Sequence, residues 1–246
     1  MAVLGLVVGA SGPAQAEEIN LILNGGFEES GGSLDHWIHV NQGAGDWYLQ
    51  SGGVSPDSGY PVPQPPQGTY AAMSDDHVNG SHVLYQPFVV PANISTATLR
   101  FDMFIGNRAG AFFTPAPASL DYDIVNPNQQ ARVDIITSAA NPFSVAPNDV
   151  LSNLYQTRPG DPLVSSDYAL QTNDLKSLLQ GHEGETLLLR FAETDNRGSF
   201  QFGVDDVRLI VTASSVIPEP STLVMAGGAA VMCLGYYWSG RKRAAS

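Results

Sequence analysis

The sequence predicts an all-β domain folded as a sandwich, and three observations favour this. The chain of 246 residues contains 25 glycines and 17 prolines, a content typical of many short strands joined by turns. Charged residues account for only 14% of the chain and hydrophobic residues for 43%, a balance that does not suit a helical bundle. Several short stretches alternate apolar and polar residues, so that one face of each can be buried while the other is solvated.

This alternation places eight strands along the central part of the chain. It is clearest around Phe101, Val133, Leu189 and Leu209, each of which has a charged neighbour on at least one side. Turns rich in Gly, Pro, Asn and Asp separate the stretches. The strands are expected at residues 19–23, 46–50, 69–73, 82–89, 99–104, 132–135, 187–192 and 207–212.

One short helix is expected before the last two strands. Asn173 can cap its first turn, and Leu175, Leu178 and Leu179 follow at the spacing of a helical apolar face. Gly181 stands where a helix commonly ends. We therefore expect a single all-β domain with one short helix over residues 17–213, between two terminal segments of a different kind.

Two long loops interrupt the strand pattern. Residues 51–68 are rich in proline and glycine, and residues 106–130 are polar and irregular. Loops of this length in a compact domain usually carry function or are disordered. A shorter connection, residues 193–198, could be read as a calcium-binding loop. A turn between two strands with Gly198 in a left-handed conformation is favoured, because an EF-type loop needs more acids at fixed spacing.

The central domain is strongly acidic. It holds all but one of the 24 acidic residues and all but three of the 11 basic residues, and the formal net charge of the whole chain is −13. Such a surface repels phosphate backbones, which excludes nucleic acid as a partner class. It is compatible with divalent cations, or simply with solubility. The only cysteine, Cys233, lies outside this domain, so no disulfide can stabilise it.

The first 16 residues have the features of a secretory signal peptide. The apolar run at residues 3–10 is too short to span a membrane. Ala14 and Ala16 give the A-x-A pattern that signal peptidase reads, and polarity rises directly after them. A buried strand is the alternative interpretation, and no Lys or Arg precedes the apolar run. We expect this segment to be removed as the chain is exported.

The last segment, residues 214–246, combines three features in a fixed order. Pro218-Glu219-Pro220 comes first, an apolar helix at residues 221–239 follows, and Arg241, Lys242 and Arg243 come last. Arginine and lysine beside a transmembrane helix stay in the cytoplasm, which places residues 17–213 outside. A permanent C-terminal anchor would explain the apolar run, but it is short for a stable span.

This order resembles the PEP-CTERM sorting signal of Gram-negative bacteria. The resemblance implies recognition and cleavage near Pro218-Glu219-Pro220 by an exosortase-type membrane transpeptidase. It also implies an organism that makes extracellular polysaccharide. The expected protein is exported, held briefly at the inner membrane by its tail, and then located at the cell surface or in the extracellular matrix.

Short motifs follow one another through the body of the chain at residues 24–28 (NGGFE), 68–72 (GTYAA), 84–88 (LYQPF), 98–102 (TLRFD), 189–191 (LRF) and 202–209 (FGVDDVRL). Their order resembles the galactose-binding-like jelly roll, the fold of many carbohydrate-binding modules. The resemblance implies a jelly-roll β-sandwich and extracellular polysaccharide as a partner. It also implies a structural calcium with carboxylate ligands from Glu28 and Asp205. The alternative is that Asp205 ends a strand and Glu28 is exposed, without an ion.

Trp47 and Tyr60 are candidates for stacking on a sugar ring, which needs a rigid and exposed aromatic side chain. Tyr60 lies in the proline-rich loop and is the ring expected at the surface. Trp47 has the spacing of a strand residue, so it belongs either to the core or to a binding face. Trp37 is expected in the core.

No catalytic motif is present: the sequence lacks a G-x-S-x-G elbow, an H-E-x-x-H zinc motif and a glycine-rich phosphate loop before a helix. The carboxylate pairs Asp75/Asp76 and Asp121/Asp123 could act as acid and base, although such pairs are usually solvated. We therefore expect a glycan- or matrix-binding module rather than an enzyme. The alternative is a secreted hydrolase of matrix polysaccharide, which requires two of these acids to converge in a cleft about 5–9 Å apart.

Overall fold

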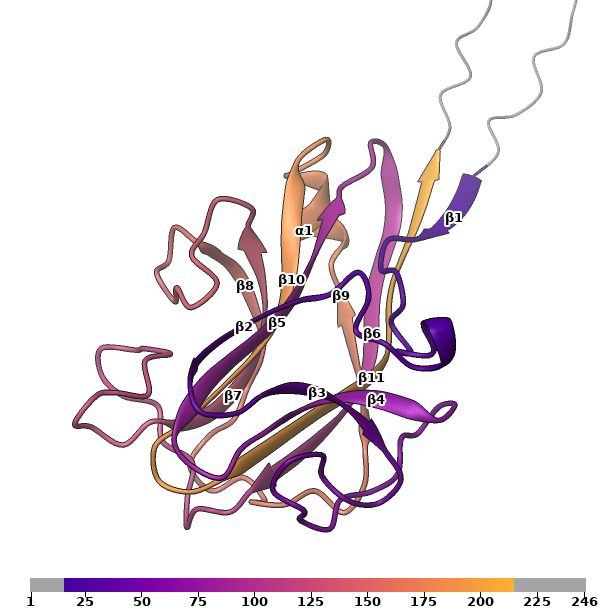
Figure 1. Ribbon diagram of the computed structural model, residues 1–246. Helices are drawn as coiled ribbons and strands as arrows, with labels where there is room; N and C mark the ends of the chain where they lie inside the picture. The colour runs from indigo at the N-terminus through magenta and orange to yellow at the C-terminus, as the bar shows by residue number, and fades with distance from the viewer. Residues whose placement is uncertain (1–15, 215–246) are drawn as a thin grey trace, which may run out of the picture. The chain divides into compact units, whose positions relative to one another are not determined.

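The computed structural model describes residues 16–214, which form two antiparallel β-sheets (Figure 1). Residues 18–213 make up one compact unit. The expected all-β sandwich is confirmed, and its strands pass repeatedly from one sheet to the other, as in a jelly roll. All of the predicted sorting segment after Ser214 and all of the signal peptide before Ala16 lie outside the described residues. Within the described part of the chain, no helix has the length and apolar character needed to cross a membrane.

The first sheet, here called sheet A, has the strand order β3-β4-β11-β6-β9, and β1 also pairs with β11. The long strands β11 and β6 run antiparallel, with Phe200 opposite Asn107 at one end. A bulge between Asp205 and Arg208 interrupts their register, and Asp206 takes a left-handed φ of 48° within it. The strands of sheet A are β1 (Ala16–Asn20), β3 (Asp46–Ser51), β4 (Tyr70–Asp75), β6 (Ile94–Asn107), β9 (Ala169–Asp174) and β11 (Phe200–Ser214).

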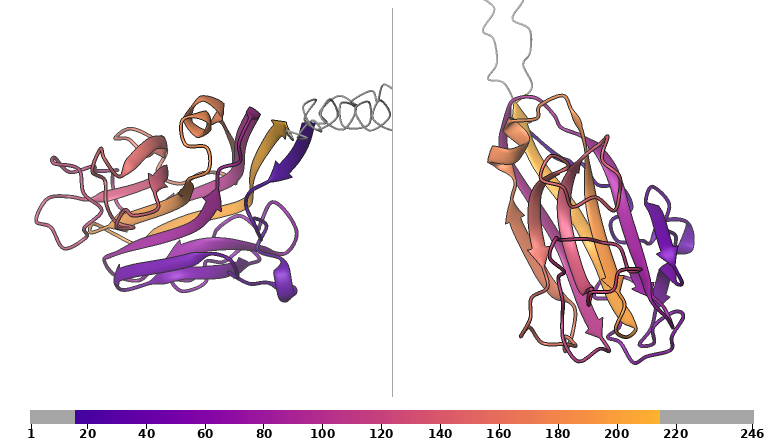
Figure 2. Two further views of the ribbon diagram at one scale, coloured as in Figure 1. Left: turned by 90° about the horizontal axis from the view of Figure 1, so that it is seen from above. Right: turned by 90° about the vertical axis from the view of Figure 1, so that its left-hand side faces the viewer.

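The second sheet, here called sheet B, has the strand order β2-β5-β10-β7-β8. In its middle, Phe191 of β10 lies opposite Leu84 of β5 and Val133 of β7, and all three side chains face the core. Seen from above, the two sheets form two layers (Figure 2). The strands of sheet B are β2 (Ile38–Gly43), β5 (Gly80–Val89), β7 (Gln129–Thr137), β8 (Val150–Gln156) and β10 (Thr186–Asp195).

Aromatic rings fill the space between the sheets. The Phe191 ring of sheet B lies 5.3 Å from that of Phe101 and 6.2 Å from that of Phe202, both in sheet A. Its third neighbour, Trp37, is 5.9 Å away and only 6% exposed, which confirms the core position expected for this tryptophan. Rings in tilted and edge-on contact at these distances stabilise a core beyond their buried area.

The short helix is confirmed as α1 (Lys176–Gln180), but Asn173 does not cap it. Asn173 lies in β9 opposite Leu99, and the Asp174 carboxylate accepts the hydrogen bond of the Lys176 N–H instead, at 2.9 Å. Gly181 ends the helix as expected. A single 3-10 turn, η1 (Glu29–Gly31), precedes β2.

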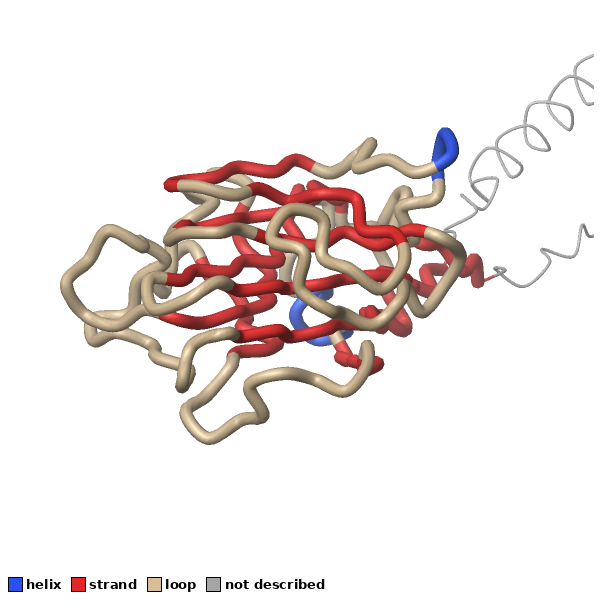
Figure 3. The backbone as a smooth tube through the Cα atoms, turned by 60° about the horizontal axis from the view of Figure 1, so that its bottom comes forward, coloured by secondary structure: helices blue, strands red, loops and turns tan. Residues whose placement is uncertain are grey.

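Long loops lie outside the two layers of strands (Figure 3). Residues 52–69 cover the outer face of sheet A, where Val62 packs on Met73 and Phe104. Residues 108–128 and 138–149 connect β6 to β7 and β7 to β8, and both lie over the outer face of sheet B. The connection after Asp195 joins the two sheets to each other, and Gly198 is not left-handed there, contrary to expectation.

Candidate functional site

The outer face of sheet B carries a groove of about 510 Å³ between its two covering loops. This volume falls in the range of small-ligand sites. One wall comes from residues 118–123 and the other from residues 143–145, with the end of β2 as the floor. The lining residues are Gln42, Ala118, Ser119, Leu120, Asp121, Tyr122, Asp123, Phe143 and Val145.

The first wall is held in place by two asparagine side chains. The Asn128 amide donates to the carbonyls of Ser119 (3.1 Å) and Asp121 (2.9 Å). The Asn196 amide, just after β10, lies within 3.2 Å of the carbonyls of Tyr122 and Ile124 and also bonds Asn126. A loop whose backbone carbonyls are bound in this way loses little conformational entropy when it binds a ligand.

The second wall is held by a buried ion cluster on the outer face of β7 and β10. Arg190 donates to the carbonyls of Pro142 (2.6 Å) and Ser144 (2.7 Å), and also to the Asp134 carboxylate (2.6 Å). Arg132 donates to the same carboxylate with two nitrogens, each at 2.7 Å. Burial alone would raise the pKa of Asp134, but Arg132 and Arg190 hold it below its usual value. The cluster is thus an ionised one that ties residues 142–144 to the sheet.

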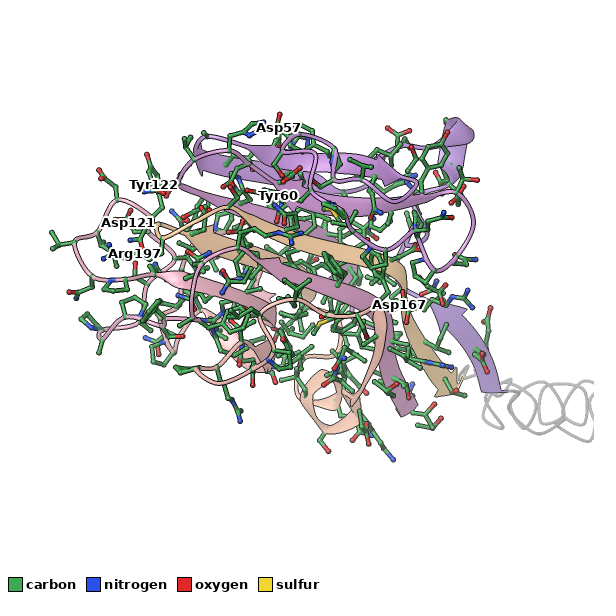
Figure 4. The ribbon with its side chains drawn as sticks, turned by 90° about the horizontal axis from the view of Figure 1, so that it is seen from below. Asp57, Tyr60, Asp121, Tyr122, Asp167 and Arg197 are labelled. Atoms are coloured by element: carbon green, nitrogen blue, oxygen red, sulfur yellow. The ribbon has the colours of Figure 1, made fainter. Side chains whose placement is uncertain are left out.

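The groove presents a tyrosine ring beside two acids and an amide. Tyr122 is partly exposed, and its ring lies over Gly43, where an added Cβ would come within 3.0 Å of the ring carbon Cζ. Asp121, Asp123 and Gln42 are exposed, and the Asp121 carboxylate accepts the Asp123 N–H at 2.8 Å. Figure 4 shows Asp121, Tyr122 and Arg197 at one end of the sandwich. A ring face flanked by carboxylate and amide groups can stack on a sugar and bond its hydroxyls.

Of the two rings predicted to stack on glycans, only Tyr60 is at the surface. It is 37% exposed in the loop over sheet A (Figure 4). The Arg108 guanidinium carbon lies 4.5 Å from the centre of its ring. Trp47 is 2% exposed and packs against Phe202, so its ring belongs to the core and cannot meet a sugar. Tyr122 was not predicted, because nothing in the local sequence distinguishes it from the other residues of a long polar loop.

The two carboxylate pairs proposed for a hydrolase lie in different places, Asp75/Asp76 in the interior and Asp121/Asp123 at the groove. Asp75 and Asp76 are both fully buried, where a polymer cannot reach them. Asp75 accepts the N–H groups of Asp57 (2.8 Å) and Ser58 (2.7 Å), which fixes the loop over sheet A. Asp121 and Asp123 are exposed at the groove instead.

The predicted calcium ligands lie beside one segment of chain, residues 67–70. Glu28 accepts the N–H groups of Thr69 (2.6 Å) and Tyr70 (2.7 Å), and Asp205 accepts that of Gln67 (3.1 Å). Burial raises the pKa of Asp205 to about 7, although the N–H groups of Asp206 and Gln67 lower it in part. Within residues 16–214, no group of three or more His, Cys, Asp or Glu side chains is arranged to hold a metal ion. The carboxylates therefore bind backbone amides and do not by themselves supply the six to eight oxygens that calcium requires.

Comparison with known proteins shows remote structural likeness only. No known protein family and no curated protein matches the sequence. Similar solved structures include the carbohydrate-binding module TmCBM61 in complex with β-1,4-galactotriose, at 13% identity and a TM-score of 0.44, over 78% of this chain and 97% of that one. A Stig cyclase from Fischerella sp. TAU is 15% identical at a TM-score of 0.45, over 81% of this chain and 100% of the cyclase. The enzymatically active domain of bacteriophage CBA120 tailspike protein 4 scores 0.44 at 11% identity, over 78% of this chain, but the match covers only 21% of that chain. Likeness this remote says nothing about a ligand.

Proposed function

We propose that the domain is a non-catalytic glycan-binding module and that its ligand lies in the groove on sheet B. The observation that carries this proposal is the Tyr122 ring, which lies in the groove beside Asp121, Asp123 and Gln42. Its loop is held by the side-chain amides of Asn128 and Asn196. A preformed site of this kind gains affinity without the entropy cost of ordering a loop. The acids at its rim repel anionic polymers, so neutral polysaccharide is the ligand class that fits best.

Binding to a panel of neutral and anionic glycans tests the proposal. Tyr122→Ala should weaken binding by about tenfold or more, because truncating an aromatic anchor costs roughly 1.4 kcal/mol or more. Tyr60→Ala is the matched control, since it removes the exposed tyrosine over sheet A. A panel without any binding, or binding that Tyr60→Ala reduces and Tyr122→Ala does not, would refute the groove as the site.

We also propose that the chain is exported and processed at both ends. Support comes from the sequence alone: Ala14 and Ala16 at one end, and Pro218-Glu219-Pro220 with the basic cluster Arg241, Lys242 and Arg243 at the other. An exosortase-type transpeptidase would be the partner, with the inner membrane as a transient location before the cell surface or matrix. Mass spectrometry of the native protein should find a chain that begins near Glu17 and ends near Pro220. An intact Arg243 terminus in the mature protein would contradict processing.

Structural calcium at Glu28 and Asp205 stays a prediction. If an ion adds oxygen ligands to these two carboxylates, a chelator should lower the thermal midpoint of the wild-type protein. Glu28→Gln should remove that sensitivity, because it removes one of the two proposed charges. A midpoint that the chelator leaves unchanged would mean that the backbone amides of residues 67–70 are the only groups these carboxylates bind.

A further inference from the structure

Three carboxyl side chains lie between the two sheets, on the face that otherwise holds the apolar core. Glu193 and Asp195 continue the inward-facing row of Phe191 along β10, because alternate residues of a strand share a face. Asp76 follows β4 on the same face as the buried Ala72. All three acids are fully buried, with 0% of each residue exposed. We call Asp76, Glu193 and Asp195 the carboxyl cluster.

Five of the six oxygens in the carboxyl cluster lack a well-formed hydrogen bond: both of Asp76, both of Glu193, and Oδ2 of Asp195. The sixth, Oδ1 of Asp195, accepts the Gly80 N–H at 2.7 Å. Burying a carboxylate without a partner costs far more than burying the neutral acid. Two adjacent carboxyls can also bond each other only if one keeps its proton, because ionised carboxylates only accept.

A histidine beside the carboxyl cluster offers an unused acceptor. Asp46 accepts the side-chain N–H of Asn41 at 2.5 Å, which turns the Asn41 carbonyl oxygen toward Nδ1 of His82, 3.0 Å away. Nδ1 must therefore donate, and Nε2 of the neutral ring is left as an acceptor without a partner. Nε2 lies 3.6 Å from Oδ2 of Asp76, and both residues are fully buried. At this distance the two groups are not hydrogen-bonded, but the lone pair on Nε2 repels a carboxylate more strongly than a carboxyl that keeps its proton.

The charges around the carboxyl cluster do not favour its ionisation. The groups that face it are Asp46, Asp57, Asp75 and His82, three of which are acids. Burial raises the pKa of Asp76 to about 7 and that of Asp195 to about 9, and it raises the pKa of Glu193 well above its usual range. Burial lowers the pKa of His82 more than the surrounding acids and the Ala44 carbonyl raise it, so the ring is neutral.

The carboxyl cluster adjoins the groove through one residue. Asp195 ends β10, and the next residue, Asn196, binds the carbonyls of the groove loop with its amide. The side-chain oxygen Oδ1 of Asn196 also accepts the backbone N–H of Asn128, the second residue that fixes this loop, at 2.8 Å. A displacement of Asp195 would therefore move both anchors of residues 118–126.

We infer that the carboxyl cluster is a buried proton-binding site that keeps the groove loop in place while protonated and loosens it as protons leave. That this loosening would regulate glycan binding rests on the proposed function, because the loop forms a wall of the same groove. The sign follows from linkage. A folded state that binds more protons than the unfolded chain loses stability as the pH rises. The loss begins at the ordinary pKa of the carboxyl groups in the unfolded chain and ends at their raised pKa in the folded protein. His82 acts in the opposite direction only below its ordinary value of 6.5. Between about pH 6.5 and about pH 9 the loss of stability therefore comes from buried carboxyls, and the Asp195→Asn variant separates the carboxyl cluster from Asp205, whose pKa burial raises to about 7.

The test compares the full-length protein with Asp195→Asn and with Asp35→Asn, an exposed acid outside the cluster. Two quantities are measured at about pH 6.5 and about pH 9: the thermal midpoint, and hydrogen exchange of residues 118–126 corrected for the intrinsic exchange rate. The wild type and Asp35→Asn should lose several degrees and much of the loop's protection at the higher pH. Asp195→Asn should lose less of both. If Asp195→Asn does not fold, Glu193→Gln takes its place.

Equal loop protection at both pH values in the wild type would overturn the inference. The inference would also be overturned if excess calcium abolished the pH dependence of the wild type but not that of Asp195→Asn. The carboxyl cluster would then be a cation site. Neither readout uses a glycan. A pH-dependent loop in a protein that binds no glycan would thus count against the proposed function alone.

Discussion

At the scale of single residues, Gly25 explains why the opening motif of the domain contains adjacent glycines. Its N-terminal neighbour, Asn24, begins a turn whose backbone meets the bulge in β11, and the Gly25 carbonyl accepts the Val207 N–H at 2.9 Å. A Cβ at Gly25 would lie 1.9 Å from the Val207 carbonyl oxygen, a backbone atom that cannot move aside. At the bulge, the first segment of the domain therefore approaches the last strand closely only because residue 25 has no side chain.

Gly25→Ala should destabilise the protein by about 2 kcal/mol or more, because the collision is with backbone and must displace the turn or the bulge. Urea unfolding measures this loss. Gly110→Ala is the matched control, since an added Cβ there meets nothing within 4 Å. Equal stability of the two variants would show that the turn adapts to a side chain at no cost.

At the scale of elements, the strands that the sequence predicts are those in which apolar and polar residues alternate. In β6 the alternate residues around Phe101 are buried. By contrast, β7 and β10 are buried on both faces, and their alternation comes from the buried ionic residues Arg132, Asp134 and Arg190. The three strands not predicted, β2, β8 and β9, all lie at sheet edges. Their side chains are half-buried or exposed, which removes the alternation on which the prediction depends.

The groove could be predicted only in part, for a related reason. Its first wall falls within the long polar loop expected at residues 106–130, yet Tyr122 gives no periodic signal there. Its anchors, Asn128 and Asn196, are 68 residues apart, and their role depends on contacts that sequence spacing does not encode. The burial of Asp76 and Asp195 was hidden in the same way, because acids on a strand normally indicate its solvent face.

The ion cluster under the second wall leads to a prediction for the pairing of β7 and β10. Asp134→Asn should destabilise the protein by about 3 kcal/mol, because it leaves Arg132 and Arg190 buried without a counter-charge. The folded pKa of Asp134 lies below its ordinary value. The ionised cluster therefore stabilises the fold at neutral pH, and this stabilisation is lost only as the pH falls through the folded pKa. Urea unfolding at neutral pH, with Asp35→Asn as the control, measures the loss, and near-equal values would mean that the arginines find other partners.

At the scale of the whole molecule, charge decides which polysaccharides can approach. The acidic residues are concentrated in residues 17–213, whereas three of the 11 basic residues lie in the tail expected to be removed. Two of the groove's exposed side chains, Asp121 and Asp123, are acids as well. The field of the domain and the chemistry of the groove therefore both disfavour a polyuronate, and both are screened by salt to the extent that their charges are exposed.

We accordingly predict that neutral glycan binding is nearly independent of ionic strength. Polyuronate binding should be absent, and lowering the salt concentration should not produce it, because weaker screening strengthens the repulsion between the acids of the domain and those of the polymer. Titration calorimetry at two salt concentrations measures both, with a chelator present, because a divalent cation could bridge carboxylates on the protein and the polymer. The double variant Asp121→Asn/Asp123→Asn should bind some polyuronate if the acids at the rim of the groove cause the exclusion. Binding of polyuronate to the wild type that weakens with added salt would instead require a cationic site, and the groove on sheet B would then not be the surface that meets the polysaccharide.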